Sequence, residues 1–237
     1  MMFYQKIADG ISMPMLGFGT FMNTGADCER TVAEAIHTGY RLIDTAEAYG
    51  NEEQVGREIK AGMENSLRLL GTDYLDLVLL HWPFADYYTA WRELEKLHKA
   101  GYICAIGVSN FEPDRLIDLI AYNDFKPVIN QIETHLYCQR QAEHLWKDKY
   151  NVAHMAYAPL GQGQANEMFT EPLVQEIAAK YGKTAAQVLL RRTMQDHTIV
   201  IPKSVHSERI AENFNVFDFE LTTAEMKLLA TLDKKVP

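Results

Sequence analysis

Long apolar runs are absent from this chain of 237 residues. No stretch approaches the roughly 18–20 apolar residues that a membrane-spanning helix needs, and no apolar signal-peptide region follows Met1–Lys6. The three cysteines, Cys28, Cys104 and Cys138, share no close spacing. Neither a disulfide framework nor a metal site is therefore expected. These absences predict a cytoplasmic protein that makes no contact with a membrane.

An excess of positive charge is also lacking. The 23 Lys and Arg residues are outnumbered by 32 Asp and Glu residues, which gives a formal net charge of −9. This balance argues against a general nucleic-acid-binding protein, which carries a basic surface. Low-complexity tracts, long flexible linkers and blocks of like charge are missing, so nothing indicates a domain boundary. We expect one domain spanning residues 1–237, with a core large enough to need no disulfide.

Short apolar runs ending in polar residues recur along the chain, with helical periodicity between them. Near-continuous apolar strands that alternate with helices indicate a parallel sheet covered on both faces. Polar residues at the carboxyl ends of strands are typical of a (β/α) barrel, whose active site lies on that face. The expected strand ends are Gly19, Asp44, His81, Ser109, Gln131, Tyr157 and Lys203, and the expected helices include Cys28–His37, Tyr87–Ala100, Asp114–Tyr122, Leu173–Tyr181 and Ala185–Gln195.

Two features near the N-terminus bear on this α/β fold. Asp9-Gly10 lies between the apolar runs Phe3–Ile7 and Ser12–Met15, which predicts a β-hairpin that covers the bottom of a barrel. The alternative fold is a doubly wound open sheet, which requires a Gly-x-Gly-x-x-Gly turn after its first strand. The only candidate turn, residues 17–20, lacks the third glycine. The barrel is therefore the preferred prediction.

Three long motifs follow one another along the chain. The first runs from Gly39 to Glu52 and continues to Val55-Gly56, the second is Gly107–Phe111, and the third is Ile201–Val205 with downstream polar residues on a helix. In this order they resemble the signatures of the aldo-keto reductase family, and the resemblance covers nearly the whole chain. It implies a (β/α)8 barrel of TIM-barrel type, an oxidoreductase that acts as a monomer and reduces small aldehydes or ketones with NADPH.

Carbonyl reduction needs a hydride donor and a group that gives a proton to the forming alkoxide. A tyrosine hydroxyl can be this acid if its pKa is brought down from about 10. The resemblance implies that Tyr49 is the acid, that Asp44 is the carboxylate paired with a lysine, and that His81 orients the substrate carbonyl. Outside the motifs, Tyr49 would be interpreted as a packed aromatic residue and His81 as a hydrogen-bonded loop histidine.

The resemblance also implies contacts to the nicotinamide half of the cofactor. Tyr157 would stack its ring on the nicotinamide, with a core aromatic residue as the alternative role. Ser109, Asn110 and Gln131 would hydrogen-bond the carboxamide. The other expected contacts in this half are Gly19 and Thr20 at the ribose and Leu160 and Gly161 over the pyrophosphate.

A third group of residues is suited to the adenosine half. Lys203, Ser204 and Arg209 supply cationic and hydroxyl donors for a 2′-phosphate, although Arg209 alone would often be a surface ion-pair partner. Arg209, Glu212 and Asn213 are spaced so that one helix face presents all three. Val205 completes the expected cofactor set. Phe21 and Trp82 would line an apolar substrate pocket or lie at its rim.

The family's catalytic lysine has no counterpart in this chain. In relatives it lies on the third barrel strand, but residues 58–67 contain no strand-like run, and Lys60 falls late in an expected helix. The interval of 37 positions from Asp44 to His81 leaves room for one β/α unit of roughly 30 residues. We therefore predict an internal deletion, with Asn51–Leu70 forming one helix and seven strands remaining in the barrel.

Loss of the lysine weakens the expected chemistry. Tyr49 loses the cation that favours its phenolate, and Asp44 loses its counter-charge. We predict turnover reduced by several orders of magnitude, with NADPH binding better preserved. Because the sequence stops at Pro237, we also expect it to lack the C-terminal loop that shapes the substrate pocket in relatives. Two alternatives are a non-catalytic NADPH-binding or redox-sensing barrel, and a deletion product that folds poorly because two strand edges are exposed.

Overall fold

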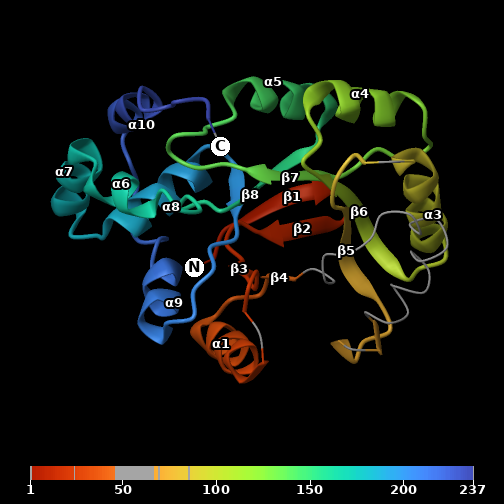
Figure 1. The fold of residues 1–237 in the computed structure, drawn as a ribbon, viewed down its shortest axis with the longest axis horizontal. Helices are drawn as coiled ribbons and strands as arrows, with labels where there is room; N and C mark the ends of the chain where they lie inside the picture. Colours follow the sequence, from red (N-terminus) through yellow and green to blue (C-terminus); the bar gives the residue numbers. More distant parts are fainter. Residues whose placement is uncertain (1, 24, 46–66, 69, 85, 237) are drawn as a thin grey trace. The chain divides into compact units, whose positions relative to one another are not determined.

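The computed structural model describes residues 2–23, 25–45, 67–68, 70–84 and 86–236 of the chain (Figure 1). The chain divides into two compact units. Unit 1 comprises Met1–Ala46, Glu133–Gln141 and His154–Pro237, and unit 2 comprises Glu47–Ile132 and Ala142–Ala153.

An antiparallel hairpin opens unit 1. Strand β1 (Tyr4–Ala8) pairs with β2 (Ile11–Pro14). Gly10 in the turn between them has a φ of 77°, a left-handed conformation that glycine adopts without steric cost. The hairpin predicted at Asp9-Gly10 is confirmed.

The first strand–helix–strand step of unit 1 follows the hairpin. Strand β3 (Phe18–Gly19) pairs in parallel with β4 (Ile43–Asp44), and helix α1 (Gly25–Thr38) connects them. Tyr40, just after α1, is buried, and its hydroxyl donates to the carbonyl oxygen of Ile210 at 3.1 Å. This bond fixes the chain where it enters β4.

The other edge of β3 pairs with the segment that begins at β9 (Thr198–Val200). The Gly17 N–H donates to the carbonyl oxygen of Val200 at 2.8 Å, and the Gly19 N–H donates to that of Pro202 at 3.1 Å. The segment around β3 therefore lies between β4 and the residues that follow β9. This arrangement brings three predicted strand ends of unit 1 to one place.

The rest of unit 1 is mainly helical. Strand β8 (Ala153–Tyr157) pairs in parallel with β9. Helix α7 (Pro172–Tyr181) is followed by its C-cap Gly182, which has a φ of 61°, and α8 (Ala185–Gln195) begins with a capping box between Thr184 and Gln187. Unit 1 also contains helices α6 (Ala165–Thr170), α9 (Ser207–Phe214) and α10 (Thr223–Ala230).

Unit 2 holds a run of parallel strands. The strands, in sheet order, are β5 (Leu75–Leu80), β6 (Ile103–Ser109) and β7 (Ile129–Glu133). The register places Leu79 opposite Gly107 and Ser109 opposite Gln131. Helix α3 (Tyr87–Lys99) packs against β5 and β6, α4 (Pro113–Ala121) follows β6, and α5 (Gln141–Tyr150) comes after β7 in the sequence.

Each unit has its own apolar core. In unit 2, Trp91 of α3 is fully buried against residues of β6 and α4, including Val108 and Leu119. In unit 1, Met168 and Leu189 belong to a cluster formed by the helices. Burial of one such large side chain contributes roughly 1.5–3 kcal/mol. These cores hold the strand ends at which the polar residues lie.

Most predicted elements are confirmed, with two differences in the strands. Gln131 is not a strand end, because β7 continues to Glu133, and the next residue, Thr134, still donates its N–H to the carbonyl oxygen of Tyr157. Strand β9 ends at Val200, before Lys203, since Pro202 has no N–H to continue the ladder. Residues 46–66, which include Tyr49 and most of the helix predicted over Asn51–Leu70, lie outside the described residues.

Candidate functional site

Polar residues meet at the carboxyl ends of β6 and β7 in unit 2. The hydroxyl of Ser109 and the N–H of Asn110 both donate to the carbonyl oxygen of Gln131, at 2.8 and 2.9 Å. The side-chain amide of Asn110 donates to Ser109 Oγ at 3.0 Å and to the carbonyl oxygen of His81 at 3.1 Å. The structure therefore brings together four predicted site residues from three strands.

Asn110 has an unusual backbone conformation. Its φ is 60°, in the left-handed region that is unfavourable for most side chains and tolerated best by Gly, Asn and Asp. The turn lets the chain leave β6 while the amide reaches back to the end of β5. Ser109 and Gln131 beside it are buried. The group is therefore held by backbone geometry as well as by its hydrogen bonds.

His81 follows β5 and begins an aromatic segment. Partial burial lowers the pKa of its imidazole below the ordinary value, which favours the neutral ring. A neutral imidazole carries one N–H donor, the group needed to orient a carbonyl oxygen. The rings of Trp82 and Phe84 stack with centroids 5.2 Å apart, and both are exposed on unit 2. Phe84 was not among the predicted site residues.

Gly19, Thr20 and Asp44 lie together in unit 1. Both the N–H and the hydroxyl of Thr20 donate to the backbone carbonyl oxygen of Asp44, at 3.0 and 2.8 Å. A Cβ at Gly19 would lie 2.8 Å from the carbonyl oxygen of Ile201, so only glycine fits between these segments. Phe21 follows at the exposed surface of unit 1. Asp44 itself is half-buried at the end of β4.

Tyr157 ends β8 and is half-buried. Burial raises the pKa of its phenol, and the nearby carboxylate of Glu133 raises it further. The ring therefore stays uncharged at neutral pH, as a stacking platform requires. Burial likewise raises the pKa of Glu133, whose carbonyl oxygen accepts a hydrogen bond from Arg140 Nε at 3.1 Å. Glu133 was not among the predicted site residues, although its place at a strand end was a signal.

A tight turn follows Tyr157. Gly161 has a φ of 73°, and its N–H donates to the carbonyl oxygen of Ala158 at 2.8 Å. A Cβ at Gly161 would collide with the end of Met168. Leu160 packs partly buried against the helical core of unit 1. The conformation of this turn therefore requires glycine at position 161.

The segment from Lys203 to Asn213 presents a mixture of exposed and anchored side chains. Lys203 and Arg209 are exposed, while Ser204 is buried and its hydroxyl accepts a hydrogen bond from the His206 N–H at 3.1 Å. Asn213 is buried, and the Glu212 carboxylate accepts a hydrogen bond from Thr184 at 2.7 Å. Both predicted cations are therefore accessible to a ligand. Val205, between Ser204 and His206, is half-buried.

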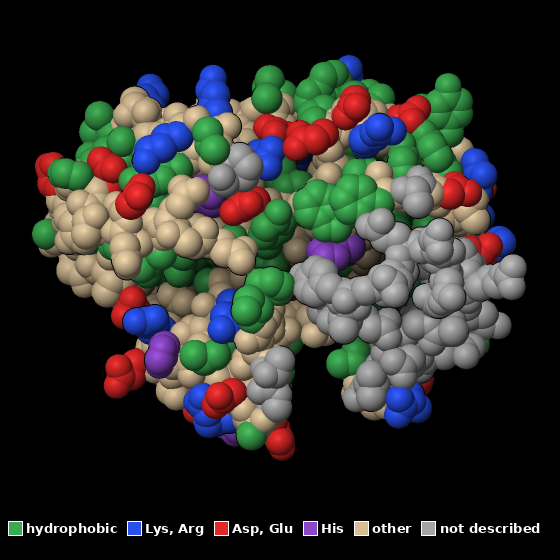
Figure 2. Space-filling view, in the orientation of Figure 1, with side chains coloured by type: hydrophobic (Ala, Val, Ile, Leu, Met, Phe, Trp, Pro, Cys, Tyr) green, Lys and Arg blue, Asp and Glu red, His purple; other side chains and the backbone are tan. Residues whose placement is uncertain are grey.

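The described ranges contain no group of three or more His, Cys, Asp and Glu side chains that could hold a metal ion. In the same ranges, every helix is too short or too polar to cross a membrane. On the face drawn in Figure 2, Lys and Arg side chains are interspersed with Asp and Glu rather than gathered in one basic patch.

Known proteins resemble this chain over nearly its full length. Residues 58–234 match the model of the Aldo/keto reductase family. An aldo-keto reductase of Mycobacterium sp. (strain JLS) is 42% identical over 255 aligned positions, covering 95% of this chain and 91% of the relative. Methylglyoxal reductase DkgA of Escherichia coli (strain K12) is 38% identical over 256 positions, covering 97% and 93%.

A solved structure gives the corresponding likeness in three dimensions. The crystal structure of an aldo/keto reductase from Brucella melitensis superposes with a TM-score of 0.89 at 35% identity, covering 98% of this chain and 100% of that chain. The fold is therefore the α/β barrel of the (β/α)8 type with an N-terminal hairpin, as the resemblance implies, and the loss of one strand stays a prediction. The doubly wound open sheet, which was the alternative, is not the fold.

Proposed function

The chain belongs to the aldo/keto reductase family, a family of NADP-dependent oxidoreductases, and from that premise we propose that it transfers hydride from NADPH to a small aldehyde or ketone. One observation carries the proposal. Asn110 joins the residue expected to orient the substrate, His81, to those expected to hold the carboxamide, Ser109 and Gln131. A reductase needs these two functions at one strand edge, because hydride and carbonyl carbon must meet.

The substrate we propose is a small carbonyl compound such as methylglyoxal. The Escherichia coli relative, 38% identical, bears the name of a methylglyoxal reductase. The exposed aromatic pair Trp82 and Phe84 beside His81 offers an apolar surface for a short carbon chain. A small substrate with two adjacent carbonyl groups is reactive and demands little of a pocket.

Each polar residue then has a distinct task. NADPH, when bound, supplies the hydride. Neutral His81 donates a hydrogen bond to the carbonyl oxygen, and Tyr49, which lies outside the described residues, gives its hydroxyl proton to the forming alkoxide. Tyr157 offers an uncharged ring for stacking. Lys203 and Arg209 are the cations that we propose for the 2′-phosphate.

We propose further that an internal deletion slows this chemistry. The alignment with the Mycobacterium relative has 255 positions but includes only 95% of this chain, which is about 225 residues. About 30 alignment positions therefore have no residue in this chain. That is the length of one β/α unit in a barrel of about 250 residues. The family match begins at residue 58, beside the expected place of the missing strand and its lysine. As the consequence, we propose a barrel of seven strands in which proton transfer from Tyr49 is slow.

The test is a pair of measurements on one purified sample. NADPH oxidation followed at 340 nm with methylglyoxal should be detectable and several orders of magnitude slower than that of full-length relatives. Quenching of intrinsic fluorescence by NADPH should report binding in the same sample. Turnover equal to that of the Escherichia coli relative would contradict the slowed chemistry, and failure to bind NADPH would contradict the function altogether.

A second candidate is a barrel that binds NADPH without turning it over. The observation in its favour is that the sequence lacks the family lysine, while Lys203 and Arg209 are present and exposed. It predicts fluorescence quenching by NADPH with no oxidation of NADPH by any aldehyde. The same two measurements therefore separate the two candidates.

A further inference from the structure

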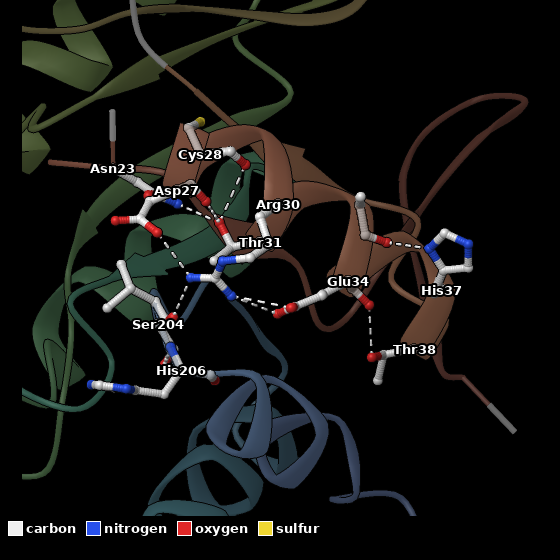
Figure 3. A network of polar contacts seen from close by, with 12 residues as sticks. Asn23, Asp27, Cys28, Arg30, Thr31, Glu34, His37, Thr38, Ser204 and His206 are labelled. Atoms are coloured by element: carbon white, nitrogen blue, oxygen red, sulfur yellow. Dashed lines mark hydrogen bonds and ion pairs between the residues drawn. The ribbon is translucent and has the colours of Figure 1, made fainter. Parts of the chain in front are cut away.

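Arg30 of α1 fastens a loop that is 175 residues away in the sequence (Figure 3). Its Nη2 donates to the backbone carbonyl oxygen of Val205 at 3.0 Å. The same guanidinium donates to Asp27 at 3.1 Å and to both carboxylate oxygens of Glu34 at 3.1 and 3.2 Å. One arginine thus joins a helix face to the middle of the loop that carries Lys203.

Asp27, Arg30 and Glu34 occupy one face of α1, because Arg30 lies three positions after Asp27 and four positions before Glu34. This face lies toward the start of α9, and Figure 1 shows α1 and α9 as neighbours. A hydrogen bond from Ser207, the first residue of α9, is the main reason that the pKa of Glu34 is lowered, and Arg30 adds to the effect. Glu34 therefore carries a negative charge beside the loop at neutral pH.

The loop also has contacts of its own. The hydroxyl of Ser204 accepts a hydrogen bond from the N–H of His206, which closes a small turn around Val205. This turn orders the loop locally, but it does not fix where the loop lies relative to α1. The bond from Arg30 to the Val205 carbonyl oxygen connects the middle of the loop to α1, and the hydrogen bond between Ser207 and Glu34 connects its end.

We propose that Arg30 is a positioning residue for the 2′-phosphate of NADPH. It holds Val205, and with it the loop between Lys203 and His206, and it balances the charges of Asp27 and Glu34. Without Arg30, two carboxylates beside the loop would repel a phosphate dianion. NADH lacks this phosphate, so the effect is selective for NADPH. The inference rests on the proposed function, because it requires that Lys203 and Arg209 bind the phosphate.

The experiment compares Arg30→Met with Arg41→Met. The Arg41 guanidinium donates to the carbonyl oxygens of Ile36 and Tyr40 instead of the loop, so its removal changes the net charge equally and leaves the loop contact in place. Kd values for NADPH and NADH are measured by fluorescence quenching at low ionic strength, together with the melting temperature. We expect R30M to raise the Kd for NADPH about fivefold, the upper range for exposed ion pairs, with NADH unchanged.

Two further variants separate the parts of the proposal. Arg30→Lys keeps the charge but has fewer donors, so it should recover part of the NADPH affinity. Adding Glu34→Gln to R30M removes one repelling carboxylate and should also recover part of it. Salt should reduce the difference between R30M and the unmodified chain, because screening weakens the repulsion.

The contradicting results are distinct. Equal NADPH affinity in R30M and the unmodified chain would overturn the role of Arg30 and leave the proposed function intact. Parallel loss of NADPH and NADH binding with a lower melting temperature would show a structural role instead. Failure of the unmodified chain to bind NADPH, in a sample that melts cooperatively, would overturn the proposed function itself.

Discussion

The side-chain amide of Asn110 donates a hydrogen bond to the backbone carbonyl oxygen of His81, with 3.1 Å between nitrogen and oxygen. His81 follows β5 and Asn110 follows β6, so this bond ties together the ends of two neighbouring strands. The residue that we propose to orient the carbonyl is therefore fixed to the group that we propose to hold the nicotinamide. The position of one depends on the other.

Replacement of Asn110 should show this dependence. Asn110→Ala loses the bond to His81 and places alanine, which adopts the left-handed region less readily than asparagine, at a φ of 60°. We therefore expect the free energy of unfolding to fall by about 2 kcal/mol. Asn110→Gly loses the same bond without the left-handed strain and should cost less. Urea unfolding of both variants measures the difference, and equal losses would contradict the contribution of strain.

Gly19 should be intolerant of a side chain. A Cβ there would lie 2.8 Å from the Ile201 carbonyl oxygen, so Gly19→Ala must move backbone and should cost roughly 1–3 kcal/mol of stability. Gly17→Ala is the matched comparison, because its Cβ would lie 2.6 Å from Leu42 Cγ and so would meet a side chain instead of backbone. G19A should also weaken NADPH binding more than G17A. A fluorescence titration in which both variants bind alike would contradict this account.

The pKa of His81 should make stability depend on pH. Partial burial lowers the folded-state pKa below 6.5, so the unfolded chain binds more protons than the folded one as the solution becomes acidic. Stability should therefore fall as pH drops from 7 through 6.5 and below, and His81→Gln should reduce that fall. NMR titration of the ring protons gives the pKa directly. A value above 6.5 would contradict the prediction.

Glu225 should make stability depend on pH in a more acidic range. Burial raises the pKa of its carboxyl, but hydrogen bonds from Lys180, Thr222 and Tyr181 outweigh burial and bring the pKa to about 2. The stabilisation is present above the ordinary value of 4.5 and is lost as pH falls toward 2. The difference in melting temperature between the unmodified chain and Glu225→Gln should shrink over this range. A constant difference would exclude the carboxylate as its source.

The sequence was most informative where a helix or strand buries apolar residues on a regular face. Helix α3, predicted over Tyr87–Ala100, spans Tyr87–Lys99, because buried residues such as Tyr87, Trp91 and Leu94 lie three or four positions apart on one face. Helix α5 was not predicted, since none of its residues is buried and it therefore has no apolar stripe. Helix α10 was also missed, although Thr222 and Glu225 form the capping box that marks its start.

The site was predictable only in part. Ser109, Asn110 and Gln131 were expected together, because the resemblance assigns all three to the carboxamide and the ends of neighbouring parallel strands share one edge of a sheet. The contact between Arg30 and Val205 was not, since nothing local relates residues 175 positions apart. The strand end at Gln131 was placed too early because a polar residue within a buried strand looks like its end. Which residues hold the cofactor stays a prediction.

The most direct test of the central claim, slow NADPH-dependent reduction with Tyr49 as acid, is the rate of NADPH oxidation with methylglyoxal in the unmodified chain and in Tyr49→Phe. Both samples should quench equally with NADPH, because the substitution removes only a hydroxyl. We predict slow oxidation in the unmodified chain and none above background in Y49F. Equal rates in the two samples would contradict the role of Tyr49, and with it the proposed mechanism.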